Sequence, residues 1–106
     1  MTQDVLGNEV RPGDVVAIAF YNYLSVLICT RIGSADNLNF TAFNEEALIH
    51  IEERWRTLRK PPYNSFINTN RGNRFCLIAP VMLSPANQSL LSRYQQLWQE
   101  MRLIKE

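Results

Sequence analysis

The stretch SPANQSLLSRYQQLWQEMRLI, residues 84–104, carries the clearest structural signal in the chain. Ser84 is a good N-cap and Pro85 suits the first helical position, so a helix is predicted to begin there. Its apolar side chains recur at helical spacing and form one face: Leu90, Leu91, Tyr94, Leu97, Trp98, Met101 and Ile104. The opposite face is polar, which predicts an amphipathic C-terminal helix over about residues 85–104. Such a helix must bury its apolar face against another layer of the protein.

The rest of the chain supplies that layer as short strands. Segments rich in β-branched and aromatic residues, separated by turn signals such as Arg11–Asp14 and Asn70–Asn73, predict antiparallel strands. The predicted strands cover residues 15–20, 24–32, 38–43, 65–69 and 74–79. The first three form a meander and the last two form a hairpin. In the third strand, Leu38 and Phe40 alternate with polar residues, which predicts burial on one face only.

A second helix is predicted between the third and fourth strands, over about residues 45–60. Asn44 is a good N-cap, acidic residues follow in the first turn, and basic residues precede Pro61 in the last turn. Four apolar residues recur at helical spacing and form a stripe: Leu48, Ile51, Trp55 and Leu58. The stretch 48–51 also fits a short strand, so the sequence leaves helix and strand open at this point.

Length and composition indicate one folded domain. The chain has 106 residues, 46% of them apolar and 20% charged, with a formal net charge of +1. These values exclude a disordered chain and predict a single domain over residues 1–106. The N-terminus lacks a signal-peptide pattern, and the longest apolar run, 15–20, is too short to span a bilayer, so we expect a cytoplasmic protein without membrane insertion. Cys29 and Cys76 lie in apolar strand segments and are expected to be free, buried thiols.

The opening of the chain resembles a known family. Residues 4–17 read DVLGNEVRPGDVVA and are similar to the start D-x-x-G-x-E-[apolar]-x-x-G-D-x-V of small SH3-like barrel proteins of tailed bacteriophages. The segment 70–78, a polar turn followed by an aromatic and apolar strand, is similar to the closing strand of those barrels. The resemblance implies a partly open antiparallel barrel of about five strands, of phage origin and without a catalytic site. With both helices added, the expected fold is α+β, with a barrel over residues 1–83 and an appended helical segment, 84–106.

Candidate catalytic and metal-binding residues are few. His50 is the only histidine, and no serine or cysteine lies in a recognisable nucleophile motif. The paired glutamates at 45–46 and 52–53 fit a helix better than an acid/base or Mg²⁺ site, because they favour its N-terminus and can pair with Arg56. One histidine and two separated cysteines do not make a zinc site, and no glycine-rich phosphate loop is present. The sequence therefore predicts no enzyme activity, no cofactor and no metal.

The net charge of +1 hides a strong polarisation along the chain. Residues 1–53 contain two basic and eight acidic side chains, whereas residues 54–74 contain six basic side chains and no acid. Five of those six are arginines, whose planar fork suits bidentate contacts to carboxylates or phosphates. Together with neighbouring aromatic residues they form the candidate partner-binding surface: Arg54, Trp55, Arg56, Arg59, Lys60, Tyr63, Arg71 and Arg74. The alternative is that these cations neutralise the acidic half within the fold.

We expect this surface to bind a host or phage protein with an acidic surface, and to inhibit or redirect it by steric occlusion. The same arginines, with Trp55 and Tyr63 as stacking platforms, could instead bind nucleic acid. A third interpretation is a structural virion protein or a homo-oligomeric assembly protein. Tyr94, Trp98 and Met101 are a candidate interface through which a homodimer could form, unless the C-terminal helix only covers the open sheet.

Overall fold

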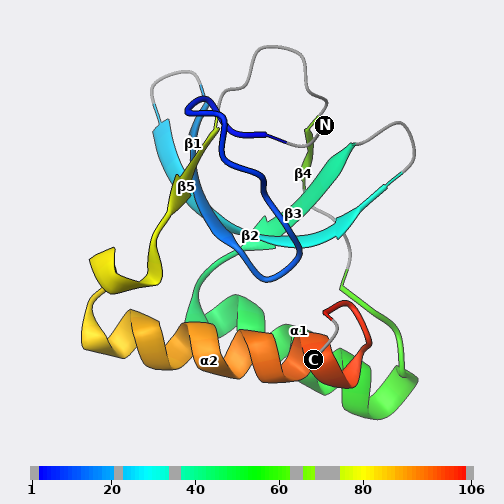
Figure 1. Cartoon of the computed structure of the whole chain (residues 1–106). Helices are drawn as coiled ribbons and strands as arrows, with labels where there is room; N and C mark the ends of the chain where they lie inside the picture. The colour runs from blue at the N-terminus through cyan, green and yellow to red at the C-terminus, as the bar shows by residue number, and fades with distance from the viewer. Residues whose placement is uncertain (1–2, 21–22, 34–36, 63–65, 69–74, 105–106) are drawn as a thin grey trace.

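The fold is α+β, as the sequence predicts. The computed structural model describes residues 3–20, 23–33, 37–62, 66–68 and 75–104. Along the chain the elements are β1 (Val15–Phe20), β2 (Tyr23–Ile32), β3 (Leu38–Ala42), α1 (Glu45–Leu58), β4 (Phe66–Asn68), β5 (Phe75–Ile78), the 3-10 turn η2 (Pro80–Met82) and α2 (Pro85–Glu100). An open antiparallel sheet lies on one side, and both helices lie together beneath it (Figure 1). The segment that begins at Glu45 is therefore a helix, and the strand alternative for 48–51 is wrong.

The sheet has the strand order β4-β3-β2-β1-β5, so β4 and β5 are its two edges. The first three strands form the predicted meander, but the prediction that the last two form a hairpin is wrong, because β4 pairs with β3 and β5 pairs with β1. All pairs are antiparallel, and in the central pair Val15 of β1 lies opposite Ile28 of β2. The register between β2 and β3 shifts between Cys29 and Arg31. A shift of this kind is what a β-bulge produces, and it re-aims the side chains that follow.

Each face of the sheet carries a hydrophobic cluster of buried residues. The helix-side cluster contains Val15, Ile28, Phe43, Leu48, Ile51, Leu90, Leu91, Tyr94, Leu97 and Trp98. The second cluster contains Val10, Val16, Ile18, Leu27, Cys29, Leu38, Phe40 and Phe75. The sheet curls around this second cluster, since the ring centroids of Phe40 on β3 and Phe75 on β5 are 5.7 Å apart although two strands separate them. The prediction that β3 is buried on one face only is wrong, because Asn39 and Thr41 are buried as well.

Helix α1 begins where the sequence predicts. The side chain of Asn44 accepts a hydrogen bond from a backbone N–H of the first turn at 2.7 Å. The predicted apolar stripe faces the helix-side cluster, except for Leu58, which is 59% exposed. The helix ends at Leu58 rather than at residue 60, because Arg59 takes a left-handed conformation and donates its N–H to the carbonyl of Trp55.

Helix α2 begins at Pro85 as predicted, but it ends at Glu100 rather than at residue 104. Arg102 takes a left-handed conformation with φ 61°. The N–H groups of Arg102 and Leu103 then donate back to carbonyls in the last turn of the helix, in the pattern of a Schellman motif. The chain reverses there, and Leu103 and Ile104 pack against the helix-side cluster. The last apolar residues therefore complete the core instead of extending the helix.

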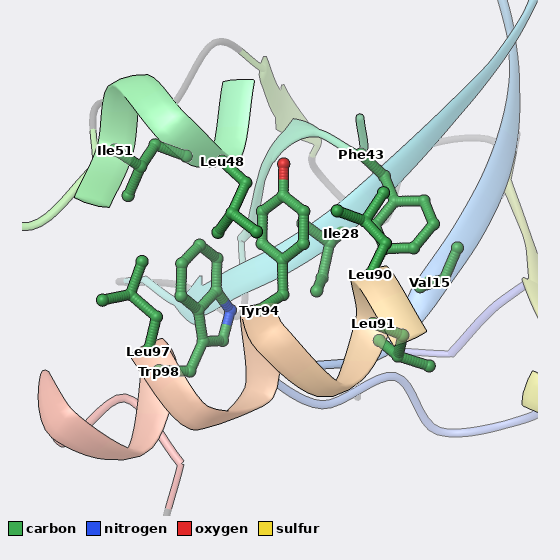
Figure 2. Packing of buried hydrophobic residues seen from close by; sticks show 10 residues of the cluster. All are labelled: Val15, Ile28, Phe43, Leu48, Ile51, Leu90, Leu91, Tyr94, Leu97 and Trp98. Atoms are coloured by element: carbon green, nitrogen blue, oxygen red, sulfur yellow. The ribbon is translucent and has the colours of Figure 1, made fainter. Parts of the chain in front are cut away.

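Two aromatic side chains of α2 fix the helix to the rest of the protein through their polar atoms (Figure 2). Tyr94 and Trp98 are fully buried, and their rings meet edge to face with centroids 5.4 Å apart. The Tyr94 hydroxyl lies 2.8 Å from the carbonyl oxygens of both Ala42 and Asn44, which share its single proton. The indole N–H of Trp98 donates to the carbonyl of Cys29 at 2.9 Å. Burial raises the pKa of Tyr94 to about 12, so its hydroxyl remains a neutral donor at physiological pH.

The N-terminal segment covers the outer edge of β5. Asp4 is 1% exposed, and its carboxylate accepts hydrogen bonds from the backbone N–H groups of Leu6 at 3.0 Å and of Asn8 and Leu77 at 2.8 Å. Val5 also donates its N–H to a carbonyl of β5 at 3.0 Å. Burial raises the pKa of the Asp4 carboxyl, but the hydrogen bonds from Leu77 and Asn8 outweigh it, so the net shift is downward.

Asp4 should make the stability of the protein depend on acid pH. Because its pKa in the folded protein lies below the ordinary value of 3.8, the carboxylate stabilises the fold above that pH and loses this effect on acidification. We predict that Asp4→Asn lowers the free energy of unfolding at pH 7 by about 1–3 kcal/mol, since the amide NH₂ faces backbone donors. Urea denaturation between about pH 7 and pH 2 should also show a flatter acid profile for this variant. An identical profile in both proteins would contradict the role of Asp4.

Gly13 is the position where the C-terminal turn meets the sheet. It has φ 93°, and a Cβ atom there would lie 2.5 Å from Cδ1 of Ile104. Gly7 has a similar φ of 84°, but no atom lies within 4 Å of such a Cβ.

These two glycines provide a matched pair of variants. We predict that Gly7→Ala lowers the free energy of unfolding by about 1–2 kcal/mol, which is the strain of an alanine in the left-handed conformation. Gly13→Ala must also shift Cδ1 of Ile104, which is the far end of a flexible side chain, so we expect the further loss to be about 1 kcal/mol or less. Urea denaturation measures both losses, and a much larger loss in Gly13→Ala would mean that Ile104 has no room to move beside Gly13.

Candidate ligand-binding pocket

A pocket of about 330 Å³ lies where β2, the end of α1 and the C-terminal turn meet. We call it the cationic pocket, and its lining residues are Thr30, Arg31, Arg54, Lys60, Pro61, Pro62 and Leu103. Of these seven described lining residues, three are cations and none is acidic. Figure 1 shows the C-terminal turn (red) near the segment that follows α1 (light green), beneath the sheet. The volume falls at the lower end of the range of ligand pockets, about 300–1,000 Å³.

The lining residues differ in burial, which distinguishes a floor, walls and a rim. The buried ones are Thr30 and Pro62, the half-buried ones are Arg54 and Leu103, and the exposed ones are Arg31, Lys60 and Pro61. The hydroxyl of Thr30 donates to the carbonyl of Asn39 at 3.0 Å, so the polar group of the floor already has a partner. The cations therefore lie at the wall and the rim, and the floor is largely apolar.

Two departures from regular backbone shape this pocket. The register shift in β2 places the consecutive residues Thr30 and Arg31 in the same lining. At the end of α1, the left-handed conformation of Arg59 turns the chain, and residues 60–62 then enter the lining. Leu103 arrives from the Schellman turn that follows α2. The pocket is therefore assembled from three segments that are far apart in the sequence.

The predicted partner-binding surface is only partly brought together. Arg54 and Lys60 line the cationic pocket. Tyr63, Arg71 and Arg74 lie outside the described residues. The structure thus places two of the predicted residues in one site and adds one further cation, Arg31, and apolar groups that the sequence did not single out.

The other predicted surface residues are engaged with neighbours on α1. The guanidinium of Arg56 pairs with Glu52 at 3.0 Å, as the spacing of four residues predicts. The guanidinium of Arg59 lies over the ring of Trp55, 5.5 Å from its centroid. Trp55 itself is half-buried and packs against the helix-side cluster. Its ring is therefore part of the protein's own packing.

Two of the four acidic residues of α1 are in ion pairs within the fold. Arg93 of α2 makes ion pairs with Glu45 at 3.4 Å and with Glu52 at 3.3 Å, and Glu52 also receives Arg56. Pairs this exposed add little stability, up to about 1 kcal/mol each. Internal neutralisation therefore holds for Arg56.

Sequence reasoning missed the pocket residues Thr30, Arg31 and Leu103. The sequence does offer one reason to consider Arg31 as a candidate binding residue, since it is a cation at the end of a long apolar strand. The register shift that turns it into the pocket, and the chain reversal that delivers Leu103, depend on tertiary contacts and have no local sequence signal.

The predicted interface on the C-terminal helix is not exposed. Tyr94 and Trp98 are fully buried, and Met101 is half-buried against the helix-side cluster. The prediction that Tyr94 and Trp98 offer a surface to a second copy is wrong, because the protein's own sheet and α1 cover them. The alternative, that the helix covers the open sheet, accounts for all three.

Other reactive residues do not form a second site. His50 lies on the outer face of α1 in an open depression with Glu46 and Glu53, all three exposed, and the described lining includes no Ser, Thr or Cys. Among the residues that the structure describes, no group of three or more His, Cys, Asp or Glu could hold a metal ion. Cys29 and Cys76 are free thiols, the first buried and the second half-buried. Burial raises the pKa of Cys29 to about 12, which makes its thiol unreactive.

Comparison with other proteins does not identify a relative. No family model, no curated protein and no solved structure matches the chain. The resemblance of the opening residues to phage SH3-like barrels stays a prediction. Within the described part of the chain, no helix is long and apolar enough to cross a membrane. The function must therefore be inferred from the geometry and charge of the cationic pocket.

Proposed function

We propose that the chain is a binding protein without catalytic activity, and that it captures the acidic surface of a partner protein at the cationic pocket. The observation that carries this proposal is the placement of Arg31, Arg54 and Lys60 around one pocket whose described lining contains no acid. Such cations attract an acidic partner over a distance and form charge-assisted hydrogen bonds on contact. A partner held there would have part of its surface covered, which would inhibit or redirect it.

The same proposal includes a partly open SH3-like barrel of phage origin. The curl that brings Phe40 and Phe75 together supports a barrel-like sheet. Three residues of the opening pattern have defined structural roles, since Gly7 and Gly13 take positive φ and Asp4 binds the edge of β5. An accessory protein of this class would meet its partner in the host cytoplasm.

Nucleic acid is a less well supported partner. Trp55, which was expected to stack on bases, packs against the helix-side cluster and carries Arg59 over its ring. Cations gathered in one pocket also differ from the extended track that a phosphate backbone follows. An assembly role through α2 lacks its candidate interface, because Tyr94 and Trp98 are buried.

A charge reversal in the pocket should weaken the capture of an acidic probe. We predict that Arg31→Glu weakens binding of a fluorescein-labelled octaglutamate peptide by about fivefold or more at low salt, because the rim then repels the peptide. The matched control is Arg11→Glu, which makes the same charge change at an exposed arginine paired with Glu9, outside the pocket lining. We expect the control to change the Kd by less than about twofold. Fluorescence anisotropy measures both values.

Two outcomes would overturn the proposal. Equal weakening in Arg31→Glu and Arg11→Glu would mean that net charge, and not the pocket, governs binding. Binding of a short oligothymidylate in the absence of peptide binding would favour the nucleic-acid alternative.

A further inference from the structure

We infer that the cationic pocket recognises a short extended peptide segment in which an acidic residue adjoins an apolar residue of about leucine size. This inference rests on the proposed function and names the chemistry of the segment that the partner presents. The cations account for only part of the pocket. The remaining lining includes Pro61, Pro62 and Leu103, whose side chains carry no polar atom.

The acidic half of the ligand follows from the cations. Arg54 is half-buried in the wall, and Arg31 and Lys60 stand at the exposed rim. An arginine presents a planar fork that matches a carboxylate, and a lysine adds a point charge beside it. A carboxylate side chain at the rim would therefore meet Arg31 and Lys60, with Arg54 adding positive charge from the wall.

The apolar half of the ligand follows from the apolar part of the lining. Pro62 is buried and Leu103 is half-buried, and both remain open to the pocket. An apolar side chain placed on them removes apolar surface from water on both partners, which favours binding. A purely acidic patch or an inorganic phosphate ion would leave this surface uncovered. The combination of both halves in one pocket therefore favours a mixed ligand.

The size of the pocket selects an extended segment over a folded surface. A volume of about 330 Å³ accommodates one or two side chains of a peptide. A single extended segment meets both parts of this small lining when its acidic and apolar side chains are neighbours along the chain, and this is the ligand that we propose.

The inference can be tested with three labelled peptides that differ at the central positions only. The first contains Glu-Glu-Leu between Gly-Ser flanks, the second replaces the Leu by Ser, and the third replaces both Glu by Gln. We expect fluorescence anisotropy to show that the first binds the wild-type protein about tenfold more tightly than either of the others. Equal Kd values for the Leu and Ser peptides would overturn the inference.

A variant of the apolar lining provides a second measurement. We expect Leu103→Ser to remove the preference for the Leu peptide while the dependence on Glu remains. The matched control is Met82→Ser, because Met82 is 77% exposed and lies outside the pocket lining, and it should keep the preference. If circular dichroism shows that Leu103→Ser is unfolded, the wild-type peptide series alone decides. Loss of the preference in both variants would count against the inference.

Failure of this inference is distinguishable from failure of the proposed function. If the Leu and Ser peptides bind equally but Arg31→Glu still weakens octaglutamate binding, the pocket captures acidic partners without reading an apolar neighbour. If none of the acidic peptides binds the wild-type protein, both proposals fail.

Discussion

The hydrogen bonds of Tyr94 and Trp98 fix one position of α2, and the rest of the structure depends on that position. The Tyr94 hydroxyl joins the end of β3 to the N-cap of α1, since it lies 2.8 Å from the carbonyl oxygens of Ala42 and Asn44. The indole N–H of Trp98 ties the same helix to β2 through Cys29. Apolar packing alone would allow α2 to slide or rotate, whereas buried polar atoms are stable only where each finds its partner. These two hydrogen bonds therefore hold the amphipathic helix α2 in a single position on the sheet.

The position of α2 determines where the chain reverses, and this reversal completes the cationic pocket. The Schellman turn after Glu100 directs Ile104 onto Gly13 and leaves Leu103 in the pocket lining. The cations come from elsewhere, from β2 and from the end of α1 and the segment that follows it. The position of α2 therefore also determines the C-terminal part of the pocket lining. The packing of the helices also determines where the opposite charges of the sequence lie. Arg93 of α2 pairs with acids of α1, while other cations line the pocket.

Much of the fold could be predicted because capping and periodicity are local properties of the sequence. Asn44 and Ser84 cap α1 and α2 as expected, and the buried faces of both helices follow their apolar spacing. The end of α2 could not be predicted, since it depends on a left-handed Arg102, a residue type without preference for that conformation. Burial of β3 on both faces depends on the curl of the sheet, which is a tertiary property. For the site, counting charges found two of the cations, whereas Arg31 and Leu103 enter only through a register shift and a chain reversal.

The most direct measurement is a nuclear magnetic resonance titration of the isotope-labelled protein with the peptide that contains Glu-Glu-Leu. If the cationic pocket is the binding site, the largest changes in backbone amide shift will fall on its residues that have an N–H: Thr30, Arg31, Arg54, Lys60 and Leu103. Changes centred instead on the outer face of α1 around His50, or spread evenly over the surface, would contradict the assignment of the site.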